Sequence, residues 1–188
     1  MTAIFSSIRV VLATMAICVA GYTTLILGFA QIVTPATANG SLVTDAGGKV
    51  VGSALVAQDF KTSRYFWPRP SAVDYNGAGA GGSNKSPTNP ELTERAEEAI
   101  GRYGATAAAP LPADLVTASG AGLDPHISLA GALYQVPRVA DARGVPEAQV
   151  KALVEQNAVA PGGAFTEGRV VNVLMLNHQL DATAPAQP

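Results

Sequence analysis

The chain has 188 residues and a formal net charge of −2, with 12 Lys and Arg against 14 Asp and Glu. Because no run of Lys or Arg occurs, the sequence lacks the basic patch by which proteins bind nucleic acid or anionic lipid. The only cysteine is Cys18, and His126 and His178 are far apart, which excludes disulfides and argues against a metal site.

Residues 10–33 form one uncharged, strongly apolar run. As an α-helix this run would span about 36 Å, which exceeds the roughly 30 Å of a bilayer core. A cleavable signal peptide is the main alternative, since residues 36–38 read Ala-Thr-Ala like a cleavage site, but its apolar core would be only about 7–15 residues long. The length therefore predicts a permanent transmembrane helix over residues 10–33.

The orientation of this helix depends on one side chain. Arg9 precedes the apolar run, and no charged residue follows it until Asp45. Positive charge is retained on the cytoplasmic side of a membrane. We therefore expect residues 1–9 to be cytoplasmic and the rest of the chain to lie outside the cytoplasmic membrane.

The remaining residues predict one soluble domain of about 150 residues, over 34–180, with a disordered tail at 181–188. Its class is α/β (α+β), with a small central sheet and about three helices. Helices are predicted over 90–103, 129–143 and 146–157 from proline and glycine boundaries and apolar stripes. Strands are predicted over 49–56, within 113–128 and over 169–177.

Residues 65–72, here called the aromatic–proline segment, combine three aromatic residues with an arginine between two prolines. Prolines restrict the local backbone, so the segment is predicted to be rigid. Two interpretations stay open. The aromatic side chains either close the core of the domain or form a contact surface for another protein, since aromatic residues and arginine dominate interfaces.

Residues 77–89 form a glycine-rich loop with almost no side-chain bulk. Gly77 and Gly82 have the spacing of a phosphate-binding P-loop, but Lys85 and Ser86 come two positions late and Pro87 prevents an immediate helix. The loop is therefore predicted to fit closely against another backbone, because residues without a Cβ atom permit such approach.

Ser119, Asp124 and His126 are the only grouping that resembles a hydrolytic triad. A serine hydrolase of the common type needs a nucleophile turn such as G-x-S-x-G, which residues 117–121 do not make. Turn and cap chemistry explains these residues more simply.

Several stretches together resemble one family, the C subunit of the bacterial Kdp potassium-transporting P-type ATPase. Beyond the amino-terminal span, the resemblance lies in seven ordered stretches that cover most of the chain. They are residues 38–42, 52–55, 65–72, 81–84, 115–124, 135–143 and 171–177.

The resemblance implies a non-catalytic accessory subunit of a high-affinity ATP-driven potassium importer in the bacterial inner membrane. Its implied partners are a channel-like potassium-translocating subunit, a P-type ATP-hydrolysing subunit and a small peptide subunit. Contact residues are then expected in the aromatic–proline segment and the glycine-rich loop. They are Tyr65, Phe66, Arg69, Gly81, Gly82, Ser83 and Asn84.

The family is also described as a catalytic chaperone that raises the ATP affinity of the hydrolysing subunit. That description implies that the chain has no cofactor of its own. It also implies that ATP is shared with the hydrolysing subunit and contacted by Gln135. The predicted topology opposes this contact, because an extracytoplasmic Gln135 could not reach cytoplasmic ATP. The alternative function is a membrane-anchored extracytoplasmic hydrolase or binding protein unrelated to transport.

Overall fold

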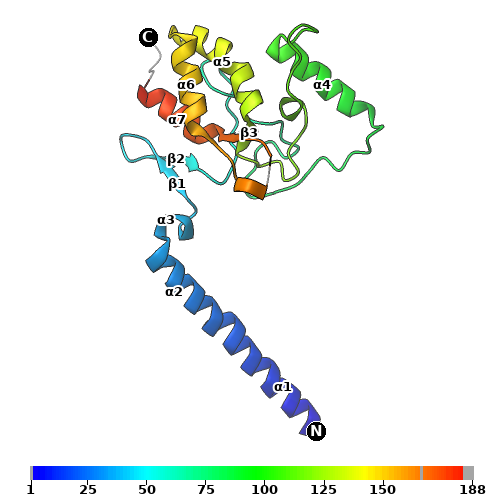
Figure 1. Cartoon of the computed structure of the whole chain (residues 1–188). Coiled ribbons are helices and arrows are strands. Elements are labelled where there is room, and N and C mark those ends of the chain that lie inside the picture. The colour runs from blue at the N-terminus through cyan, green and yellow to red at the C-terminus, as the bar shows by residue number, and fades with distance from the viewer. Residues whose placement is uncertain (1, 166, 184–188) are drawn as a thin grey trace. The chain divides into compact units, whose positions relative to one another are not determined.

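The computed structural model describes residues 2–165 and 167–183. The chain divides into two compact units, Met1–Leu42 and Val43–Pro188. Figure 1 shows the first as a long helix and the second as several helices around short strands. The expected fold class, an apolar amino-terminal helix followed by a domain with small sheets and several helices, is confirmed.

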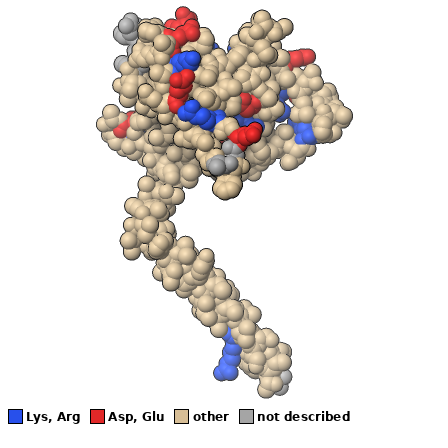
Figure 2. Space-filling model, in the orientation of Figure 1, with Lys and Arg blue, Asp and Glu red and all other residues tan. Residues whose placement is uncertain are grey.

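The amino-terminal unit is helical from Thr2 to Val33, longer than the predicted span. Helices α1 (Thr2–Met15) and α2 (Thr23–Val33) are joined by a π-helical segment, Ala16–Tyr22, and a short helix α3 (Pro35–Ala38) follows. Arg9 is the only charged side chain of this unit, and Figure 2 shows one blue side chain on its helix. By length and composition the helix is able to cross a membrane.

A hairpin of β1 (Leu42–Thr44) and β2 (Val50–Ser53) opens the domain. Asp45 forms its turn by accepting hydrogen bonds from the backbone N–H groups of Gly47 (2.9 Å) and Lys49 (3.0 Å). The predicted strand 49–56 was too long. It ends at Ser53, whose hydroxyl accepts a hydrogen bond from Leu55 N and so starts a turn.

A three-stranded antiparallel sheet lies inside the domain, with the strand order β3–β5–β4. Its strands are β3 (His126–Ser128), β4 (Ala158–Val159) and β5 (Val170–Asn172). Val171 at the centre is paired with Ile127 on one side and with Ala158 on the other. Within 113–128 only β3 is a strand, and Ala113–Leu115 is instead a turn of 3-10 helix.

Helices α4 (Pro90–Tyr103), α5 (Leu129–Arg143) and α6 (Glu147–Asn157) occur where the sequence predicted them. Asn89 caps α4, Ser128 caps α5, and left-handed glycines at 104 and 144 end the two helices. The core lies where α5, α6 and a seventh helix meet the sheet. It includes Ile127, Val136, Val139, Val150, Val154, Val171, Leu176 and Leu180.

The predicted final strand 169–177 is wrong beyond Asn172, because the chain turns there into helix α7 (Val173–Thr183). Asn172 accepts a hydrogen bond from Met175 N (3.1 Å) and thereby caps this helix. The buried positions of α7 have helical spacing: Val173, Leu174, Leu176, Asn177 and Leu180. Residues 181–183 therefore belong to α7, and the rest of the predicted disordered tail, 184–188, lies outside the described residues.

Candidate functional site

The aromatic–proline segment has no regular secondary structure and is not a strand of either sheet. Its side chains divide between the core and the surface. Phe66 is 0% exposed and belongs to the hydrophobic core, and Trp67 is 6% exposed. Tyr65 and Arg69 are half-buried. Phe66 and Trp67 therefore close the core, whereas a contact role for Tyr65 and Arg69 stays a prediction.

Two side-chain amides bind the backbone of this segment at consecutive residues. Asn177 of α7 accepts a hydrogen bond from Phe66 N (2.8 Å) and donates one to Phe66 O (3.0 Å). Gln135 of α5 accepts from Trp67 N (2.8 Å) and donates to Trp67 O (3.1 Å). Both amides are 1% exposed. No strand pairs with this segment, so side-chain amides satisfy the backbone N–H and C=O groups of Phe66 and Trp67.

Two arginines stack on the ring of Trp67. The guanidinium carbons of Arg138 and Arg102 lie 3.6 and 3.9 Å from the ring centroid, within the range of cation–π attraction. Arg138 also donates to Ser63 O (2.6 Å) and Tyr65 O (3.1 Å). Burial lowers the pKa of Arg138 to about 10, so the side chain remains a cation at neutral pH.

Arg143 anchors the start of the segment from inside the domain. Its buried guanidinium donates to Arg64 O (2.7 Å) and forms a 2.8 Å ion pair with Asp181, to which the Tyr65 hydroxyl also donates. Burial first, and then the hydrogen bond to Asp181, raise the pKa of Tyr65.

Arg69, the predicted contact residue between the prolines, faces a turn that follows residue 117. Its guanidinium forms a 3.2 Å ion pair with Asp124 and donates to Ala118 O (3.4 Å). The backbone of the segment is held here too, because Ser119 N donates to Pro70 O (3.2 Å). The arginine is therefore oriented by the domain before any partner binds.

The glycine-rich loop packs on the same turn. Gly81 N donates to Ala121 O (2.9 Å), and a Cβ atom on Gly82 would lie 2.7 Å from Gly120 O. The close backbone approach that the sequence predicted occurs within the domain. Ser83 is half-buried, and Asn84 is exposed with a positive φ of 48°.

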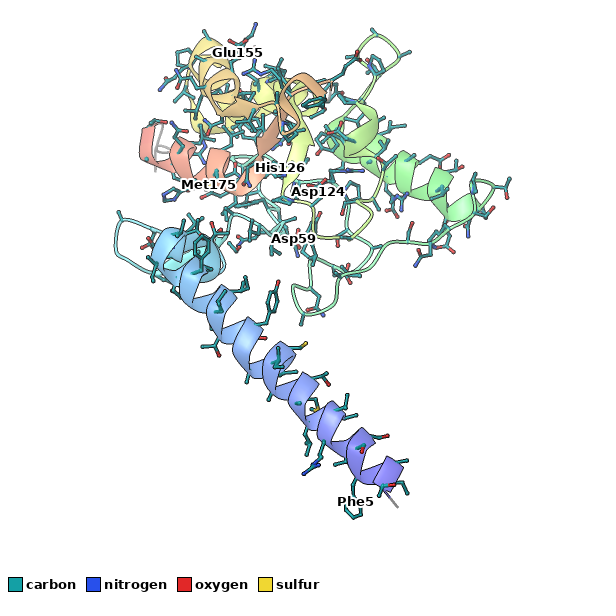
Figure 3. All side chains as sticks on the ribbon, turned by 60° about the horizontal axis from the view of Figure 1, so that its bottom comes forward. Phe5, Asp59, Asp124, His126, Glu155 and Met175 are labelled. Carbon is teal, nitrogen blue, oxygen red and sulfur yellow. The ribbon has the colours of Figure 1, made fainter. Side chains whose placement is uncertain are left out.

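Ser119, Asp124 and His126 lie close together, and Figure 3 shows Asp124 beside His126. Asp124 accepts a hydrogen bond from His126 N (3.0 Å), and its other oxygen binds Arg69. Ser119 is buried, and its hydroxyl accepts from Asp124 N (3.5 Å). Among the contacts of the described residues, none joins the Ser119 hydroxyl to His126, so the group has the geometry of a turn.

A cavity of about 450 Å³ lies beside the aromatic–proline segment, between the β1–β2 hairpin and α7. Its polar lining includes Asp45, Gln58, Tyr65, His178 and Asp181. The described residues contain no group of three metal-ligating side chains, here or elsewhere.

Of the predicted site residues, Tyr65, Phe66, Arg69 and Gln135 lie in or on the aromatic–proline segment. Asn177, Arg138 and Arg143 hold this segment, and none of them was predicted as a site residue. A signal was present for Asn177, because this asparagine directly follows the apolar residues 173–176. A buried amide in such a run needs partners.

Comparison with known proteins gives consistent results. The family model described as "K+-transporting ATPase, c chain" (KdpC) matches residues 4–182. A potassium-transporting ATPase KdpC subunit from Parvibaculum lavamentivorans is 59% identical over 186 residues, which cover 99% of this chain and 100% of the relative. KdpC subunits from Rhodopseudomonas palustris strain TIE-1 (49% over 180 residues, 87% and 89% covered) and Geobacter metallireducens (44% over 183 residues, 95% and 97% covered) are also similar.

Proposed function

Because this chain belongs to the KdpC family, the c chains of K+-transporting ATPases, we propose that it is a non-catalytic accessory subunit of an ATP-driven potassium importer. In this proposal its single helix anchors it in the bacterial inner membrane and its domain lies outside the cytoplasm. There it supports assembly with the channel-like, the ATP-hydrolysing and the small peptide subunits. The presence of the chain raises the ATP affinity of the hydrolysing subunit.

The observation that carries the proposal is the extent of the family match. It runs from residue 4 to residue 182 and so includes both the apolar helix and the domain. The two units are therefore parts of one family member.

The contact surface in this proposal is the exposed side of the aromatic–proline segment together with the glycine-rich loop. Tyr65, Arg69 and residues 81–84 contribute to it, and Phe66 supports it from the core. This surface is preorganised for binding. Arg69 is already fixed by Asp124, so less side-chain entropy is lost when a partner binds.

The proposed effect on ATP affinity is indirect. Arg9 favours an extracytoplasmic domain, on the opposite side of the membrane from ATP. The amide of Gln135, the residue expected to meet nucleotide, is buried in hydrogen bonds to Trp67. Contact with the other subunits is then the route by which this chain acts.

The test uses the tagged full-length chain, expressed with the other subunits of its own potassium pump. We expect two larger membrane proteins to co-purify with it, and the complete complex to have a lower KM for ATP than a complex without the chain. Arg69→Ala should weaken co-purification, whereas Lys151→Ala, which changes an exposed side chain of α6, should not. A chain that purifies alone, and whose deletion leaves the pump's ATP KM and potassium-stimulated rate unchanged, would refute the proposal.

A further inference from the structure

Gln135 uses every hydrogen-bonding position of its amide inside the protein. An amide oxygen accepts two hydrogen bonds and an amide nitrogen donates two. The oxygen of Gln135 accepts from Trp67 N (2.8 Å) and from Nη2 of Arg138 (2.6 Å), and the nitrogen donates to Trp67 O (3.1 Å) and Gly131 O (3.3 Å). A new ligand could bind this amide only after one of these bonds had broken.

The paired hydrogen bonds have the form of strand pairing. In an antiparallel sheet, two facing residues exchange both of their N–H···O=C bonds. Gln135 exchanges two bonds with Trp67, and Asn177 exchanges two with Phe66. We call these four bonds the amide clasp. The clasp joins α5 and α7 to two consecutive residues of a segment that is not part of a sheet.

The clasp also determines where the Trp67 ring lies. Arg138 binds the Gln135 oxygen with one nitrogen and stacks on the Trp67 ring. Because two guanidinium groups within 4 Å of one centroid would collide on the same side, Arg138 and Arg102 lie on opposite faces. The ring edge is fixed as well, since Nε1 donates to Thr62 O (2.9 Å). The amide, the ring and the two cations form one packed unit.

We propose that Gln135 is a positioning residue. Together with Asn177 it fixes the aromatic–proline segment in the conformation that the adjoining subunit contacts, and it acts on the pump through that segment without touching nucleotide. The part about the pump rests on the function proposed above.

A spectroscopic test of the clasp uses the isolated full-length chain in detergent, because Trp67 is the only tryptophan of the chain. Gln135→Met keeps the length of the side chain but removes all four hydrogen bonds of the Gln135 amide, two of which belong to the clasp, so we expect the Trp67 emission to shift to the red. Gln156→Met is the matched control, since Gln156 is exposed on α6. Emission of Gln135→Met that equals that of the wild type would overturn the proposal.

A second variant keeps this test decisive if Gln135→Met does not fold. Gln135→Glu retains the two acceptor bonds to Trp67 N and Arg138 and loses the two donated bonds to Trp67 O and Gly131 O. We expect a smaller red shift in the same direction. No shift in a folded Gln135→Glu chain would again contradict the clasp.

The assembled pump separates positioning from nucleotide contact. If Gln135 acts through the segment, Asn177→Leu on the other half of the clasp should raise the KM for ATP by about the same factor as Gln135→Met, and Gln156→Met should leave it unchanged. A raised KM in Gln135→Met but not in Asn177→Leu would indicate direct nucleotide contact and overturn the proposal. If removal of the whole chain leaves the KM unchanged, the proposed function fails, and the Trp67 emission still decides whether the clasp exists.

Discussion

Gly122 lies in the turn that faces Arg69, and this turn requires a residue without a side chain at that position. Its φ is +69°, in the left-handed region that L-residues rarely adopt. A Cβ atom there would lie 2.6 Å from Val73 Cγ2 and 2.8 Å from Gly81 O. Gly122 therefore serves both the backbone of the turn and the close fit of the glycine-rich loop.

We expect Gly122→Ala to lower the free energy of unfolding by about 2–4 kcal/mol, from left-handed strain and overpacking together. Gly101→Ala is the control, because Gly101 lies in α4 and a Cβ atom there would meet open space, and it should raise stability by about 0.5–1 kcal/mol. Urea denaturation of the full-length chain, followed by circular dichroism, measures both. A change of only a few tenths of a kcal/mol for Gly122→Ala would contradict this role.

At the scale of elements, helix α4 is attached to the domain mainly at its carboxyl end. Ala99 is its only buried residue among those described. Tyr103 packs edge-on against Trp67 (5.1 Å between centroids) and against Tyr134 of α5 (6.2 Å), and Arg102 stacks on Trp67. The aromatic contacts join α4 to the same Trp67 that the amide clasp holds.

Burial raises the pKa of Tyr103 from 10.0 to about 12. The unfolded chain ionises this phenol at a lower pH than the folded chain does, so its contribution to stability is complete below pH 10 and is lost as the pH rises through about 12. We expect Tyr103→Phe, which cannot ionise, to lose less stability than the wild type over this range. Melting temperatures at a series of alkaline pH values would show it, and parallel curves for the two proteins would refute it.

At the scale of the whole molecule, the distribution of charge separates the two units. One charged side chain, Arg9, lies in the helical unit, and the other Lys, Arg, Asp and Glu residues lie in the domain. Because positive charge is retained on the cytoplasmic side, Arg9 favours a topology in which the amino-terminal end is cytoplasmic and the domain lies outside the cytoplasm.

We therefore expect a cysteine in the domain to react with a membrane-impermeant thiol reagent in intact cells. Ala148→Cys in a Cys18→Ala background is suitable, because position 148 is exposed on α6. The Cys18→Ala chain without the new cysteine is the control for background labelling. Protection of the introduced cysteine until the cells are lysed would place the domain in the cytoplasm and make direct ATP contact by Gln135 worth testing again.

The sequence by itself determined the features whose causes are local. The uncharged run predicted the long helix, and proline and glycine boundaries predicted the limits of α4 and α5, because such residues act on the backbone within a few positions of themselves. Several ordered stretches were also sufficient to suggest the family, which the match over residues 4–182 confirms.

Only the tertiary structure decided the rest. Residues 173–177 are apolar enough for either a strand or a helix, and the cap at Asn172 together with packing on the sheet made them α7. The amide clasp joins Trp67 to Gln135 across 68 residues and Phe66 to Asn177 across 111. Local patterns carry no information on such pairs, because a buried amide requires hydrogen-bond partners but does not specify where in the chain they lie.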